Sequence, residues 1–114
     1  MSVTLVTAYE VAKANVYLTI VIGNAQLGSS AVKLNNKVLG TGDIEELLVG
    51  KGPSIEGKPL SVKSVVTDVN DKTNQTSIRY KLKGGKFDKN YDLEATVSQE
   101  GESVIYRATF HLKA

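Results

Sequence analysis

The C-terminal part of the sequence alternates between apolar and polar side chains almost without interruption. Three segments carry the pattern, and their apolar members are Ile78, Tyr80 and Leu82, then Tyr91, Leu93, Ala95 and Val97, and finally Val104, Tyr106, Ala108, Phe110 and Leu112. Because successive side chains of a strand point to opposite faces, a period of two places one set in a core and the other in water. The pattern predicts antiparallel β structure and leaves few residues over for chemistry.

The N-terminal part of the chain contains a second clear strand pattern, at residues 15–22. Its even-numbered positions are all apolar, and Gly23-Asn24 then supplies a turn. A shorter strand is predicted at residues 3–7. The segment 8–14 that follows it is either a connection or a helical turn, the latter because Ala, Glu and Lys dominate it.

Turn-forming residues divide the middle of the chain. Asn35-Asn36 lies between two short apolar segments and predicts a tight hairpin tip, since asparagine tolerates a positive φ. The segment 43–49 has two interpretations. Either Asp43 caps a helical turn, or Ile44 and Leu47 belong to an irregular edge strand.

Two long hairpins are predicted in the second half of the chain. The first joins residues 60–66 to 76–83, with 68–74 as a polar loop. Its register is Val62 opposite Leu82, Ser64 opposite Tyr80 and Val66 opposite Ile78. The second has Val97 opposite Val104, Ala95 opposite Tyr106 and Leu93 opposite Ala108. That register also places Glu94 opposite Arg107, an ion pair worth a few tenths of a kcal/mol.

Together these elements predict one domain, residues 1–114, folded as an all-β immunoglobulin-like antiparallel sandwich of about seven to nine strands. A partly open β-barrel is the alternative. Trp and the paired Cys of antibody domains are missing. The segment Tyr91–Val97 resembles the strand after the tyrosine corner of fibronectin type III and other immunoglobulin-like domains, and this resemblance carries no functional residue.

Composition narrows the classes of function. The 114 residues contain 14 Lys and Arg, 12 Asp and Glu, and no Cys. A net charge of +2 gives no indication of a nucleic-acid partner. Without cysteine the chain has no disulfide, thiolate metal site or cysteine nucleophile. No signal peptide and no membrane span are recognisable, so a soluble chain of unknown localisation is expected.

Three motifs suggest chemistry, and each has a simpler interpretation. Gly52–Lys58 has the spacing of a nucleotide-binding phosphate loop, but Pro59 follows where Ser or Thr is needed, which favours an ordinary crossover. The oxygen-rich segment 68–75 could hold calcium, yet the same residue types favour a turn. His111 is the only histidine and has no apparent catalytic partner. We therefore expect no cofactor, no metal and no enzyme.

The candidate binding residues form a basic stripe on the polar face of the first predicted hairpin. They are Lys63, Arg79, Lys81 and Lys83, with the apolar Val65 and Val69 on the same face. Such a surface suits an anionic partner, although outward strand positions are often charged for solubility alone. Without interleaved aromatic residues, nucleic-acid binding is not expected.

The function that fits these features is a non-catalytic binding or structural module. It would contact another protein, or a second copy of itself, within a larger surface or assembly protein. Val65, Val69, Ile105 and Val21 are apolar where their strands predict water, so we expect some of them to be covered by a partner. One alternative is a carbohydrate-binding module that uses Tyr9 and Tyr17, which are expected to be exposed. Another is a small inhibitor or immunity-type protein that presents the loop 68–74.

Overall fold

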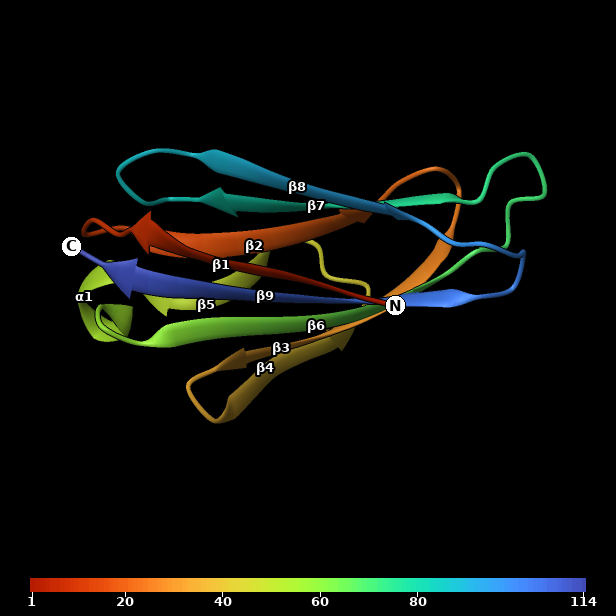
Figure 1. Cartoon of the computed structure of the whole chain (residues 1–114). Helices are drawn as coiled ribbons and strands as arrows, with labels where there is room; N and C mark the ends of the chain where they lie inside the picture. The colour runs from red at the N-terminus through yellow and green to blue at the C-terminus, as the bar shows by residue number, and fades with distance from the viewer.

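The computed structural model describes all residues from 1 to 114 and is built almost entirely of strands (Figure 1). The elements are β1 (Ser2–Glu10), β2 (Asn15–Ile22), β3 (Leu27–Leu34), β4 (Lys37–Gly42), β5 (Leu47–Lys51), α1 (Gly52–Ile55), β6 (Pro59–Thr67), β7 (Gln75–Lys83), β8 (Lys89–Thr96) and β9 (Ser103–Lys113). The one helix has four residues, too few to cross a bilayer.

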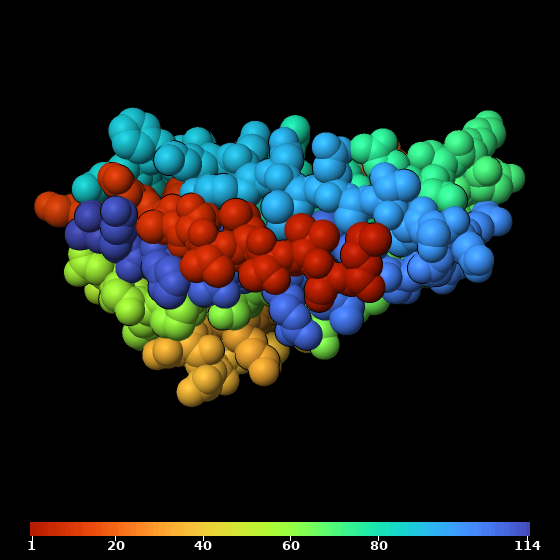
Figure 2. Space-filling view, in the orientation of Figure 1, coloured from red at the N-terminus to blue at the C-terminus, as the bar shows by residue number.

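The strands form two stacked sheets. One has five strands in the order β1-β9-β6-β3-β4, and the other has four in the order β5-β2-β7-β8. β1 pairs with β9 in the parallel sense, and every other strand pair is antiparallel. β1 runs along one side of the molecule with no segment in front of it (Figure 2). The prediction of an all-β sandwich of seven to nine strands is confirmed, whereas a barrel is not formed.

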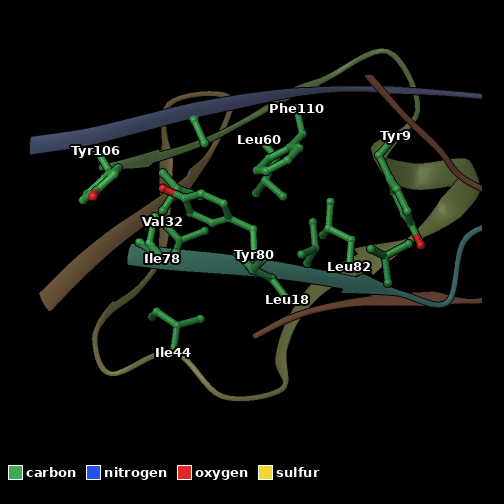
Figure 3. Close-up of a cluster of buried hydrophobic side chains, with 14 of the residues drawn as sticks. Tyr9, Leu18, Val32, Ile44, Leu60, Ile78, Tyr80, Leu82, Tyr106 and Phe110 are labelled. Carbon is green, nitrogen blue, oxygen red and sulfur yellow. The ribbon is translucent and has the colours of Figure 1, made fainter. Parts of the chain in front are cut away.

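The core lies between the sheets and contains most of the alternate apolar residues that the sequence pattern selected, together with residues that it did not select, such as Tyr9 and Ile55. Leu18 and Tyr80 project from the four-stranded sheet, and Val32, Leu60 and Phe110 project from the five-stranded sheet (Figure 3). The rings of Tyr80 and Phe110 meet edge to face with their centroids 5.7 Å apart. Aromatic pairs of this geometry stabilise a core beyond the area they bury.

Several local predictions are confirmed. Residues 15–22 form β2, and Asn35-Asn36 forms the β3–β4 hairpin tip, where Asn35 has a φ of +56°. Residues 47–51 form an edge strand, so the helical alternative for 43–49 is wrong. The helical turn considered for 8–14 is also wrong, because β1 continues through Glu10.

Both long hairpins predicted in the second half of the chain are wrong. β6 pairs with β3 and β9, and β7 pairs with β2 and β8, so β6 and β7 belong to different sheets. Val62 consequently lies opposite Val32 and Ala108 instead of Leu82. An alternating strand presents the same apolar face to any other alternating strand, and therefore its parity does not identify its partner.

The second hairpin fails for the same reason. β8 remains beside β7, and the chain then crosses to the other sheet, where β9 pairs with β6 and β1. Glu94 lies opposite Ser77, and Arg107 lies opposite Lys63 and Thr4. The ion pair expected between Glu94 and Arg107 is therefore not formed.

The side of the sandwich between β1 and β8 is closed near the C-terminal end of β1. The Tyr91 hydroxyl donates to the carbonyl oxygen of Ala8 at 3.3 Å, and the Gly85 amide donates to the Tyr9 hydroxyl at 3.0 Å. A side chain at Gly85 would collide with the Tyr9 ring and the Glu10 carbonyl, so this close approach requires glycine. Tyr91 joins the two sheets and is not a tyrosine corner, which bonds to nearby upstream backbone.

Candidate binding site

The structure divides the predicted basic stripe between opposite sides of the sandwich. Lys63 and Val65 lie on the outer face of the five-stranded sheet. Arg79, Lys81 and Lys83, by contrast, lie on the outer face of the four-stranded sheet. Val69 belongs to the connection between β6 and β7 and is 52% exposed. The predicted single surface does not exist, because it depended on the incorrect pairing of β6 with β7.

The outer face of the four-stranded sheet carries charges of both signs. Nε and Nη2 of Arg79 donate to the two carboxylate oxygens of Asp92 at 2.6 and 3.1 Å. This hydrogen-bonded pairing with Arg79 lowers the pKa of Asp92 below its ordinary value. A hollow of about 420 Å³ on this face is lined by Arg79, Lys81, Asp92 and Glu94, so cations and carboxylates share it. Such a mixed surface has no marked preference for the sign of a ligand's charge.

The outer face of the five-stranded sheet has a different character. β6 lies between β9 and β3, which places Lys63 beside Arg107 on one neighbour and beside Ala31 on the other. One row further along, Ser61 lies between Thr109 and Lys33. These six side chains surround a hollow of about 390 Å³. We call this site, made of Lys33, Lys63, Arg107, Ala31, Ser61 and Thr109, the basic hollow.

The cations of the basic hollow have no carboxylate partner. The two ion pairs of the structure are Arg79–Asp92 and Lys86–Glu10, and neither involves the hollow. Glu10 is the only acidic residue at an outward position of the five-stranded sheet, and it lies 3.7 Å from Lys86. Lys63 and Arg107 are like charges directly opposite each other, an arrangement that destabilises a sheet. An anion bound between them would relieve this repulsion.

An apolar pair lies next to the basic hollow. Val65 is directly opposite Ile105, one row from Lys63 and Arg107, and it is 39% exposed while Ile105 is half-buried. Of the other apolar residues expected to face water, Val21 is 42% exposed on the opposite face of the molecule. None of the four belongs to the core, so their coverage by a partner stays a prediction.

Of the three cations of this site, sequence reasoning proposed Lys63 and missed Lys33 and Arg107. Both occupy outward positions, and the alternation of the last strand indicated that of Arg107. Their proximity to Lys63 depends on β3, β6 and β9 being neighbours, although 35 or more residues separate β9 from the other two along the chain. Only the order of strands in the sheet could have identified the cluster.

The remaining sequence motifs form no second site. Gly52–Lys58 contains the single turn α1 and crosses between the sheets from β5 to β6, as its simpler interpretation predicted. His111 is exposed on β9, opposite Ala8 and Pro59. No group of three or more His, Asp or Glu side chains is arranged to hold a metal ion.

The connection 68–74 is organised by one side chain, Gln26. Its Oε1 accepts from the amides of Val69 and Asn70 at 2.8 and 2.9 Å, and its Nε2 donates to the carbonyls of Thr73 and Gln75 at 3.3 and 3.0 Å. The segment expected to form a turn is thus a connection between the two sheets that Gln26 holds in place. The Asp68 carboxylate is buried, and neither of its oxygens has a hydrogen-bond partner.

Comparison of the chain with known protein families, with curated proteins and with solved structures gives no significant match.

Proposed function

We propose that this chain is a non-catalytic binding module that contacts an acidic segment of another protein through the outer face of its five-stranded sheet. The observation that supports the proposal is the basic hollow. Lys33, Lys63 and Arg107 come from three adjacent strands, surround one depression and lack carboxylate partners.

The chemistry of the hollow suits carboxylate ligands. The Arg107 guanidinium can bind a carboxylate through two parallel hydrogen bonds, and the two lysines add point charges. The hydroxyls of Ser61 and Thr109 can donate to the same anion, because both line the hollow. The adjacent Val65–Ile105 pair would bury an apolar side chain of the same segment. Charges around an apolar contact are typical of protein interfaces.

A protein partner fits this face better than a sugar or a nucleic acid. Sugar rings and single-stranded bases usually stack on exposed aromatic side chains, and no Tyr, Phe or Trp occupies an outward position of this sheet. Of the two tyrosines expected to be exposed, Tyr9 is 1% exposed, which corrects that expectation. Tyr17 lies on the opposite face, beside Lys83.

The proposal is tested with a glutamate-rich peptide that contains one central leucine, titrated into the labelled protein and followed by NMR. We expect amide shifts in β3, β6 and β9 rather than in β2, β7 and β8. Binding should weaken as salt is added, because the contact is exposed and electrostatic. A sulfated oligosaccharide serves as the second probe. Binding of the oligosaccharide without binding of the peptide would favour the carbohydrate alternative.

Charge reversal on each face provides the matched comparison. The variant Lys63→Glu/Arg107→Glu should weaken peptide binding about tenfold or more, because two attractive contacts become repulsive. The variant Lys81→Glu/Lys83→Glu changes the net charge equally on the other face and should leave binding within about twofold. Equal losses in both variants would mean that only net charge matters, which would contradict a specific site.

A further inference from the structure

β1 leaves a row of backbone groups without partners at the edge of the five-stranded sheet. The Met1 carbonyl accepts from the Ile105 amide, and the Val11 amide donates to the Lys113 carbonyl, so the odd-numbered residues of this segment point their backbone groups toward β9. The even-numbered residues point theirs away from the sheet. At Ser2, Thr4 and Val6 no other strand or side chain receives them.

Other parts of the protein cover only the C-terminal part of this edge. The carbonyl oxygen of Ala8 accepts from the Tyr91 hydroxyl, and that of Glu10 accepts from the Lys86 amide at 3.0 Å. The half from Ser2 to Val6 stays open, in agreement with the uncovered position of β1 in the space-filling view (Figure 2).

The other three edge strands carry the features that normally prevent pairing between molecules. β4 and β5 are short, contain lysine and glycine, and join their neighbours through register shifts. β8 presents Asp92 and Glu94 outward. β1, in contrast, has nine residues in continuous register with β9, and residues 2–9 contain no charge, proline or glycine. It is the one unprotected edge of the sandwich.

We infer that β1 pairs antiparallel with β1 of a second copy of this chain, with the two-fold axis at Thr4. Ser2 then lies opposite the second copy's Val6, and Thr4 lies opposite its own counterpart. Each of these pairs exchanges both N–H···O bonds, which uses the open backbone groups from Ser2 to Val6. The two five-stranded sheets become one continuous sheet.

Side chains support a second copy as the occupant. The half-buried Val3 of one molecule would lie opposite the half-buried Leu5 of the other on the inner face, so the seam covers apolar surface in both cores. On the outer face, Ser2, Thr4 and Val6 bring no charge to the contact. The two Arg107 side chains would be about 14 Å apart, at three strand spacings, which exceeds the Debye length of about 10 Å in ordinary buffer.

The first test is sedimentation of the intact chain over a wide range of concentration. We expect a monomer–dimer equilibrium, and Thr4→Pro should weaken dimerisation about tenfold or more. The Thr4 amide points away from β9, and proline is tolerated at such edge positions, so this variant loses no bond within the monomer. Thr4→Ala retains the amide and should dimerise like the parent protein. Circular dichroism confirms that both variants are folded.

The second test is a disulfide at the axis. The chain contains no cysteine, so Thr4→Cys introduces a single thiol whose counterpart would be about 5.5 Å away between Cα atoms, within disulfide range. Oxidation should cross-link Thr4→Cys much faster than Thr41→Cys, which places a thiol on the opposite edge of the same sheet. A parent protein that stays monomeric at every concentration, a dimer insensitive to Thr4→Pro, or equal cross-linking of the two cysteine variants would each overturn the inference. None of these results bears on peptide binding at the basic hollow.

Discussion

Two tyrosine hydroxyls in the same core have opposite surroundings. The Thr76 hydroxyl donates to the Ala95 carbonyl at 2.7 Å, so the Tyr106 hydroxyl donates to Thr76 Oγ1 at 2.5 Å. The Tyr80 hydroxyl is equally buried and lies near the Ser64 hydroxyl, but it forms no hydrogen bond of acceptable geometry. Burial raises the pKa of both phenols above the ordinary value, so both remain protonated at neutral pH.

Removing each hydroxyl should therefore have a different effect on stability. Tyr106→Phe loses a satisfied bond and leaves Thr76 with one partner fewer, so we expect unfolding to become easier by about 1 kcal/mol. Tyr80→Phe removes a buried polar atom that bonds to nothing, and we expect no loss or a gain of about 1 kcal/mol. Urea unfolding of the two variants measures both effects. Equal destabilisation would show that the Tyr80 hydroxyl has a partner.

For single residues, the sequence predicted which side chains are buried better than it predicted their hydrogen-bond partners. Alternation correctly assigned Tyr80 and Tyr106 to the core, because parity within a strand decides which face a side chain takes. Tyr9 was expected to be exposed and is buried, since its segment was considered a connection or a helical turn rather than the continuation of β1. Hydrogen-bond partners such as Thr76 and Tyr106 lie in different sheets, and parity contains no information about them.

Among the elements, β7 and β8 form one of the two hairpins that stay within a sheet, and Arg79 and Asp92 join them across the outer face. Their side chains are 48% and 60% exposed, so the pair contributes little to the free energy of unfolding. Because the pKa of Asp92 is lowered in the folded state, the contribution is present above the ordinary carboxyl pKa. It is lost as the pH falls through the lowered value.

This pairing has a direct spectroscopic consequence. An NMR titration of the Asp92 carboxyl should give a pKa below the ordinary aspartate value, and Arg79→Gln should return it to that value. Lys81→Gln removes a neighbouring cation that does not contact Asp92 and serves as the control. An Asp92 pKa that is the same in the parent protein and in Arg79→Gln would show that the ion pair is not populated in solution.

The elements that the sequence predicted correctly are those defined by neighbouring residues. The β3–β4 hairpin has its signal in Asn35-Asn36, and β2 has its signal in its own alternation. β6 and β7 were paired because they follow one another and match in parity, yet their connection crosses between sheets. Local turn chemistry marks where a strand ends, whereas the choice of partner is made by the whole core.

In the molecule as a whole, the chain passes repeatedly from one sheet to the other. Only β3–β4 and β7–β8 connect strands within one sheet, and every other connection crosses the core. Neither sheet is therefore a continuous piece of chain, and we expect neither to fold while the other is unfolded. The basic hollow also depends on this connectivity, because β3, β6 and β9 become neighbours only when the chain has crossed between the sheets several times. This is why the sequence alone did not reveal it.

This connectivity predicts that the two sheets unfold together. Amides in the centre of the five-stranded sheet, such as Val62 and Ala108, should exchange with deuterium at the same free energy as amides in the centre of the other sheet, such as Leu18 and Tyr80. Native-state hydrogen exchange in low denaturant measures this directly. Two separate free energies, one for each sheet, would contradict the prediction.

The parallel pairing of β1 with β9 also determines how the molecule carries mechanical load. The chain enters at the start of β1 and leaves at the end of β9, and the two strands are aligned over nine Cα pairs (Figure 1). Tension applied between the termini therefore pulls these strands past one another and loads their hydrogen bonds in shear, together rather than one after another. A domain pulled in this geometry resists unfolding far better than a hairpin whose hydrogen bonds break one after another from its open end.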